Sequence, residues 1–182
     1  MALIVEDGTG LANADSYISL ANAIAYLNTR NLPSLPLVDP FLNADQGDQE
    51  NALRIATEYM VSEYRFRWAG YRRTQVQSLD WPRVWVPITD AAGYGGYGGY
   101  PAYFDPNSVP AQVAQACADL ATRALSADLA PDIERIEKTV RVGPISVEYD
   151  TNQAVATLYR AVKNKLAPFL VGNASRTSLI RT

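Results

Sequence analysis

The sequence contains no histidine and only one cysteine among its 182 residues. Histidine is the commonest general base and zinc ligand, so its absence excludes Ser-His and Cys-His nucleophile pairs and most familiar hydrolase mechanisms. A single cysteine, Cys117, can form neither an intrachain disulfide nor a thiolate metal cluster, and we expect it to be a small buried residue. The sequence also lacks a Gly-Lys-Ser/Thr phosphate loop and a Rossmann glycine fingerprint. We therefore expect no enzyme activity, no catalytic residues and no cofactor.

Acidic side chains are the one remaining source of metal ligands, and four of them lie close together in the sequence. They occur in a stretch rich in Pro and Asn that leads into a predicted helix, where the helix dipole favours negative charge. Their spacing lacks the central Gly and terminal Glu of a calcium-binding loop. We interpret them as solvated charges at a helix N-terminus and predict no metal site. The four residues are Asp39, Asp45, Asp48 and Glu50.

The last 32 residues, 151–182, contain no Asp or Glu. All 19 acidic residues lie in the first 150 positions beside 11 basic ones, so this body carries a net charge of −8 and the remainder carries +5. An acidic body with a basic, partly apolar arm is expected to bind an acidic partner surface, as assembly proteins do. The basic residues of the arm are Arg160, Lys163, Lys165, Arg176 and Arg181.

Long hydrophobic runs are also missing. No stretch of 18 apolar residues occurs, and the first seven residues turn acidic at Glu6 and Asp7. We therefore expect no membrane association and a protein made in a cytoplasm. With 48% hydrophobic residues, a chain of this length is typical of one globular domain that buries roughly 70% of its unfolded surface.

Apolar spacing predicts a mainly α fold, a small bundle of about four helices with a β-hairpin, a short N-terminal strand and long loops. The strand is expected at residues 3–5, and the Pro-rich residues 31–48 are expected to form a loop. Ser19 and Ser108 are predicted to cap the first and third helices, and Pro168 is predicted to kink or end the fourth. The apolar faces of these four helices are Leu20, Ile24 and Leu27; Leu53, Ala56, Met60 and Tyr64; Val113, Cys117, Leu120 and Ala124; and Val155, Leu158, Tyr159, Val162 and Leu166.

The strongest β signal lies at about residues 138–149, where a turn at Gly143-Pro144 suits a type II′ hairpin. This turn pairs Val142 with Ile145, Arg141 with Ser146, Val140 with Val147 and Thr139 with Glu148. We predict one domain over residues 1–172, with the hairpin and a mobile Gly/Tyr-rich insertion at about 88–107, followed by a docking tail at 173–182. Tyrosines of the insertion, such as Tyr94 and Tyr103, could contact partners or only form a loose tip.

Arginines alternate with aromatic residues between Tyr64 and Arg83. This mix of residues is used to stack bases and pair with phosphates, and it is also found in subunit interfaces. We favour the interface because acidic neighbours dilute the patch and the sequence pI is near 5.0. Trp81 and Trp85 are expected to be packed anchors, because Pro82 and Pro87 hold them in a rigid connection. The predicted interface residues are Arg65, Arg67, Trp68, Arg72, Arg73, Trp81 and Arg83.

The chain also resembles a known family. The resemblance rests on the opening segment 3–17, the Trp81-Pro82-Arg83 triplet, Val109-Pro110, and Val142-Gly143-Pro144 before Val147-Glu148-Tyr149. Together these are similar to the head-tail adaptors of tailed bacteriophages, whose members are often labelled DnaT-like single-stranded-DNA-binding proteins. The alternative function is therefore single-stranded-DNA binding of the DnaT-like type.

The resemblance implies a structural protein of the virion neck, without catalysis. It implies a homo-oligomeric ring, commonly of twelve subunits, which binds the portal protein and a stopper or tail-completion protein. Double-stranded genomic DNA would pass through the ring's lumen without specific binding, and we expect weak or no binding of single-stranded DNA. The fourth helix and the tail are expected to dock on the portal through Lys163, Lys165, Leu166, Phe169, Leu170, Arg176, Leu179, Ile180 and Arg181.

Overall fold

The computed structural model describes residues 2–91, 102–131, 139–142, 145–148 and 159–171. It confirms the predicted fold class, a mostly helical bundle with a two-stranded antiparallel hairpin. The main helices are α1 (Leu20–Asn28), α3 (Gln46–Tyr64), α4 (Ala111–Ala124) and α5 (Arg160–Leu166), and short helices α2 (Val38–Leu42) and η1 (Ala167–Phe169) complete the set. No helix of the described part is long and apolar enough to cross a membrane.

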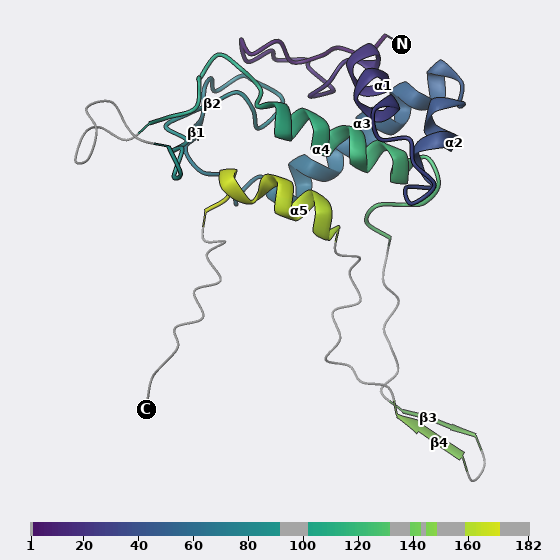
Figure 1. Ribbon diagram of the computed structural model, residues 1–182. Coiled ribbons are helices and arrows are strands. Elements are labelled where there is room, and N and C mark those ends of the chain that lie inside the picture. The colour runs from purple at the N-terminus through teal and green to yellow at the C-terminus, as the bar shows by residue number, and fades with distance from the viewer. Residues whose placement is uncertain (1, 92–101, 132–138, 143–144, 149–158, 172–182) are drawn as a thin grey trace, which may run out of the picture.

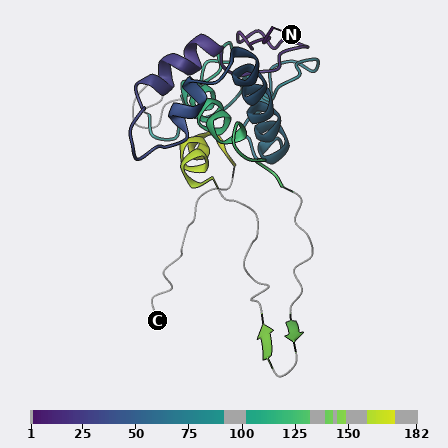
Figure 2. The ribbon, with the colours of Figure 1, turned by 90° about the vertical axis from the view of Figure 1, so that its right-hand side faces the viewer.

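Helix α4 lies at the centre of the bundle, in contact with α1, α2, α3 and α5 (Figures 1 and 2). Its central position follows from its sequence, because small and apolar residues occupy nearly all of its inward positions and let neighbouring helices approach closely. Val113, Cys117 and Leu120 of the predicted stripe are fully buried, while Ala124 is half-buried. The thiol of Cys117 lies 3.2 Å from the Thr57 hydroxyl of α3, so it joins the two best-packed helices.

The predicted helices are confirmed in most particulars. Ser19 caps α1, with its side-chain oxygen accepting a hydrogen bond from the backbone N–H of Asn22. Helix α5 ends at Leu166, two residues before Pro168, and the chain continues as the 3-10 helix η1, which contains this proline. The apolar face predicted for the second helix is buried along α3, whereas Val155 and Leu158 lie outside the described residues.

Three local expectations were wrong. Residues 31–48 include α2, because Pro40 lies in the first turn of that helix, where a missing N–H is tolerated. Residues 3–5 form no strand, only an isolated bridge between Val5 and Ser16. The N-cap of α4 is Pro110 instead of Ser108, whose hydroxyl donates to the Asp105 carbonyl.

The described residues contain two antiparallel pairs of strands. The pair β3 (Thr139–Val142) and β4 (Ile145–Glu148) has the predicted register, with Val142 opposite Ile145 and Thr139 opposite Glu148. The pair β1 (Tyr71–Arg72) and β2 (Arg83–Val84) was not predicted. It lies at one end of the bundle, opposite α2 (Figure 1). The Gly/Tyr-rich segment leaves and re-enters the structure beside β2, where Pro87 bridges to Tyr103, and residues 92–101 of it lie outside the described residues.

Candidate nucleic-acid interface

The end of the bundle that carries β1 and β2 is built on a buried aromatic cluster. Trp81 is 0% exposed, and its ring meets Trp68 and Phe169 edge to face with centroids 5.8 and 5.5 Å apart. Leu170 joins Trp68 through an isolated bridge, so α5 and the end of α3 are tied together here. Such aromatic contacts bury much apolar area and fix ring orientation. The cluster therefore gives the loops above it a rigid base.

A buried arginine connects this base to β2. The guanidinium of Arg83 donates to the carbonyls of Ala69 at 2.8 Å, Gly70 at 2.7 Å and Asp80 at 3.2 Å. Burial lowers the pKa of Arg83, and the nearby Asp80 charge opposes this effect. With its donors used by backbone carbonyls, Arg83 holds the residue 69–70 turn against the start of β2.

The carboxylate of Asp80 lies beneath the same turn, with its side chain 1% exposed. Its Oδ1 accepts from Arg65 Nε at 3.1 Å, and its backbone N–H donates to the Tyr17 hydroxyl at 3.0 Å. Within the described residues, Asp80 Oδ2 and the indole N–H groups of Trp68 and Trp81 have no hydrogen-bond partner. Burial raises the pKa of Asp80, and the neighbouring Arg65 and Arg83 charges partly counter the rise.

Above this base the strand geometry turns a tryptophan outward. Side chains of a regular strand alternate between faces, yet Arg83 and Val86 are both buried while Trp85 is 65% exposed. Trp85 adopts a positive φ of 61°, the one such non-Gly residue among those described. As in a β-bulge, this residue breaks the alternation and points away from the core. A left-handed backbone costs an L-residue about 1–2 kcal/mol.

The exposed Trp85 ring has a partner from the far side of the Gly/Tyr-rich segment. Tyr103 packs edge to face against it, with the centroids 5.5 Å apart and the planes at 89°. Backbone hydrogen bonds hold the two segments in register, from Ile88 N–H to the Ala102 carbonyl and from Phe104 N–H to the Val86 carbonyl. Two further exposed aromatic residues are Phe66, which follows the end of α3, and Tyr71, the first residue of β1.

Two arginines at the strand paired with β2, Arg72 of β1 and the following Arg73, form no ion pair among the described residues, although the charge of Arg73 helps to lower the pKa of Asp7. Arg72 donates to the Gln77 carbonyl at 3.1 Å, and Arg73 donates to the Gly8 carbonyl. Neither has a carboxylate within ion-pair distance among the residues that the structure describes, unlike Arg65 and Arg67, which pair with Asp80 and Glu63. Residues 64–85 contain five arginines and one aspartate, a net charge of +4 on an acidic protein.

We name the exposed set Phe66, Tyr71, Arg72, Arg73, Trp85 and Tyr103 the aromatic–arginine surface. Of the residues predicted for a subunit interface, Trp68, Trp81 and Arg83 are buried within this chain, so their side chains are not offered to a neighbour. Arg72 and Arg73 belong to the surface, and Arg65 and Arg67 lie at its base in ion pairs. The expectation that Trp85 would be a packed anchor was wrong; Trp81 is one.

The residues assigned to portal docking are not gathered on one surface. Leu166, Phe169 and Leu170 are buried in the core, and Lys165 pairs with Asp119 of α4. Lys163 is half-buried on α5. The remaining members, Arg176, Leu179, Ile180 and Arg181, lie outside the described residues. The four acidic residues considered as metal ligands form no such group, and none is found in the described part of the chain.

Comparison with known proteins assigns the family. The family model described as "Putative DnaT-like ssDNA binding protein" matches residues 1–182, so the chain belongs to this family. Searches of curated proteins and of solved structures found no match.

The family assignment corrects the sequence interpretation. The head-tail adaptor function was wrong, because the description of the matching family names DnaT-like single-stranded-DNA binding and nothing in the comparisons points to an adaptor. The expected ring, its virion-neck context, and its portal and stopper partners therefore have no support. The expected passage of double-stranded DNA without specific binding conflicts with the family description. Single-stranded-DNA binding of the DnaT-like type was the alternative function expected from the sequence, and the family match supports this alternative.

Proposed function

We propose that this protein binds single-stranded DNA through the aromatic–arginine surface. The observation that carries the proposal is that the β1–β2 pairing brings the exposed, edge-packed Trp85–Tyr103 unit and the arginines Arg72 and Arg73, which form no ion pair among the described residues, to the same end of the bundle. Base stacking on aromatic rings is tolerant of sequence, and arginine pairs with the phosphates between the bases. This role requires no catalytic group.

The acidic composition of the protein does not oppose this assignment locally. Electrostatic attraction between exposed groups falls off over about 8–10 Å at physiological salt, so a strand senses nearby charges more than the whole-molecule sum. The segment of net charge +4 surrounds the exposed rings.

The strained backbone at Trp85 also supports a binding role. A bulky residue in the left-handed region is stabilised only when the surrounding structure imposes it, and such residues concentrate at ligand contacts. Here Arg83, Gly70 and the paired segment at Tyr103 impose the conformation. The fixed backbone holds the Trp85 ring in one exposed position, which lowers the entropy cost of binding.

The test uses the different exposures of the three tryptophans. Trp68 and Trp81 are buried and Trp85 is exposed, so quenching of tryptophan fluorescence by an unlabelled oligo(dT) reports on Trp85. We expect saturable quenching in the wild type and none in Trp85→Phe. Anisotropy with a labelled oligo(dT) should show that Trp85→Ala weakens binding by about 1–3 kcal/mol, roughly 5- to 150-fold.

Ile55→Ala is the matched control, since Ile55 is an exposed apolar residue in the middle of α3. We expect it to bind like the wild type. The proposed function is overturned if the wild type shows no saturable binding at physiological salt. The assignment to this surface is overturned if Trp85→Ala and Ile55→Ala bind equally well.

A further inference from the structure

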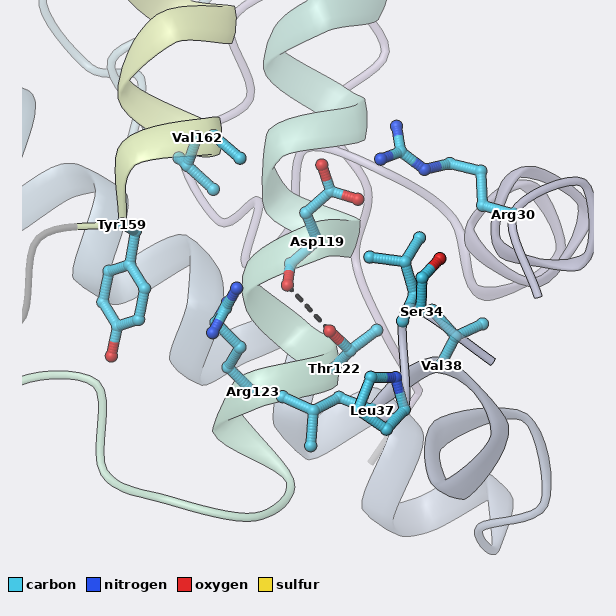
Figure 3. Close-up of a pocket in the computed structure, with 12 residues that line it drawn as sticks. Arg30, Ser34, Leu37, Val38, Asp119, Thr122, Arg123, Tyr159 and Val162 are labelled. Atoms are coloured by element: carbon cyan, nitrogen blue, oxygen red, sulfur yellow. Dashed lines mark hydrogen bonds between the residues drawn. The ribbon is translucent and has the colours of Figure 1, made fainter. Parts of the chain in front are cut away.

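A concave site lies at the C-terminal half of α4 and shares no residue with the aromatic–arginine surface. It is a pocket of about 240 Å³ formed by the loop before α2, the C-terminal half of α4 and the start of α5 (Figure 3). Apolar side chains of three separate segments supply much of its lining, among them Leu35, Val38 and Val162. Its volume is below the roughly 300–1,000 Å³ of most small-molecule sites, so it suits a fragment such as a single base.

Two arginines line this pocket without a carboxylate of their own. Arg30 donates to the Tyr26 hydroxyl at 2.6 Å, and the Arg123 guanidinium lies 5.4 Å from the centroid of the Tyr159 ring. Neither forms an ion pair with any residue in the described ranges. Arginine forms directed, charge-assisted hydrogen bonds to phosphate, so each of the two side chains offers an anion-binding group.

The acid in the pocket is already neutralised. Asp119 pairs with Lys165, and it accepts from the Tyr26 hydroxyl at 3.2 Å. The same hydroxyl accepts from Arg30, so Arg30, Tyr26, Asp119 and Lys165 form one network with two positive charges and one negative. Arg123 adds a third positive charge. An anionic group therefore meets a net attraction here. Burial raises the pKa of Tyr159, the Arg123 charge opposes the rise, and Asp128 adds to it.

A planar stacking surface adjoins these charges. Tyr159 is held by the edge of Tyr59, with centroids 5.5 Å apart at 85°, and by hydrogen bonding of its hydroxyl to the Leu129 carbonyl at 3.2 Å. In the view of Figure 3 the Arg123 guanidinium lies between the Tyr159 ring and Thr122. A guanidinium that stacks on a ring with one face can stack on a base with the other. The Ser34 hydroxyl across the pocket is available to a base edge.

We propose that this pocket binds one nucleotide unit, with its base against Arg123 and the apolar lining and its phosphate on Arg30. A purely apolar occupant would make no use of the two guanidinium charges, and a free phosphate would leave the apolar lining in contact with water. A nucleotide satisfies both halves of the pocket. The site stands apart from the proposed function, because it uses none of the residues of the aromatic–arginine surface.

The test titrates the full-length protein with the four deoxynucleoside 5′-monophosphates and with the matching deoxynucleosides, by calorimetry. We expect saturable binding of at least one monophosphate. The matching nucleoside should bind at least about tenfold more weakly, since the phosphate contact is lost. Arg123→Gln and Arg30→Gln should each weaken monophosphate binding by on the order of tenfold. Arg160→Gln, which removes the same charge from an exposed residue of α5 outside the pocket, should leave binding unchanged.

Absence of saturable binding by all four monophosphates overturns the inference, as does an equal loss in Arg160→Gln. Trp85→Ala should bind the monophosphate normally, so a failure of the proposed function and a failure of this inference give different results. The nucleotide in the pocket could belong to a bound DNA strand or be free in solution, and the oligo(dT) affinity of Arg123→Gln distinguishes these two sources. A loss assigns the pocket to a nucleotide of the bound strand, and an unchanged affinity assigns it to a free nucleotide.

Discussion

Trp85 and Tyr103, 18 positions apart in the sequence, meet edge to face with their ring centroids 5.5 Å apart on the surface of the protein. Trp85 is 65% exposed and Tyr103 43%. The contact leaves a face of each ring available, because an edge-to-face pair covers only one face of one partner. This exposed pair, at the same end of the bundle as two arginines that form no ion pair among the described residues, is what the proposed binding of single-stranded DNA depends on.

The first prediction concerns the backbone at position 85. Trp85→Gly and Trp85→Ala both remove the ring, but only glycine adopts φ near 61° without a steric penalty. We expect the free energy of unfolding of Trp85→Gly to exceed that of Trp85→Ala by up to about 1 kcal/mol. Glycine removes the steric penalty of the left-handed backbone, but its greater conformational freedom in the unfolded chain offsets part of this gain. Urea denaturation followed by circular dichroism measures the difference. If the alanine variant is the more stable of the two, the conformation at residue 85 is not strained.

The second prediction concerns salt. Each phosphate contact with single-stranded DNA contributes about −0.7 to the slope of log K against log salt concentration. Arg72→Gln should therefore make the slope less negative by about 0.7 and weaken oligo(dT) binding at low salt. Arg67→Gln is a poor comparison because it would release Glu63, so Arg160→Gln of α5 serves as the control. Equal slopes for Arg72→Gln and the wild type would remove Arg72 from the DNA contact.

The third prediction concerns the pH dependence of stability at Asp80. Burial raises the pKa of this carboxyl in the folded protein above its ordinary value of 3.8, so folding favours the protonated form. Its contribution to stability is fully present below pH 3.8 and is lost as pH rises through the folded pKa. Asp80→Asn does not titrate, so its stability relative to the wild type should increase from pH 3.5 to pH 7.

Denaturant unfolding of both proteins at several pH values measures this difference. The other acidic groups contribute equally to both proteins, which makes the wild type the internal reference for the variant. A difference that stays constant with pH, or one that changes in the opposite direction, would show that the Arg65 and Arg83 charges outweigh burial.

The fourth prediction concerns the turn that precedes β1. Gly70 has φ of 66°, and a Cβ there would lie 2.2 Å from the Val84 carbonyl oxygen and 3.0 Å from the Trp85 carbonyl carbon. Gly70→Ala should therefore destabilise the protein by more than the roughly 1–2 kcal/mol of the left-handed backbone alone. It should also weaken oligo(dT) binding, because β2 and Trp85 must move.

Gly47→Ala is the matched control for this change. Gly47 lies at the start of α3, and a Cβ there meets nothing within 4 Å. Alanine favours a helix over glycine by up to about 1 kcal/mol, so this variant should be as stable as the wild type or more so. Thermal and urea unfolding of the two alanine variants measures the difference in stability. Equal stability would mean that the turn at residues 69–70 accommodates the added Cβ at little energetic cost.

The sequence determined those features that depend on near neighbours in the chain. Periodic apolar residues predicted α1, α3, α4 and a fourth helix that includes α5, because a helix places residues three and four apart on one face. The pairing of β3 with β4 followed from one turn and from strict alternation. The mixture of arginine and aromatic residues near β1 was also visible, but its role was assigned to an interface, and the family resemblance led to an adaptor function that the comparisons contradict.

Only the tertiary structure decided which of these side chains face water. Trp81 and Trp85 look alike in the sequence, since each is followed closely by proline, yet one is fully buried and the other is exposed. The difference arises from the positive φ at residue 85 and from the Arg83 and Gly70 contacts that impose it, which no local pattern encodes. The pocket at Arg30 and Arg123 likewise joins segments about 90 residues apart, so its chemistry exists only once the chain has folded.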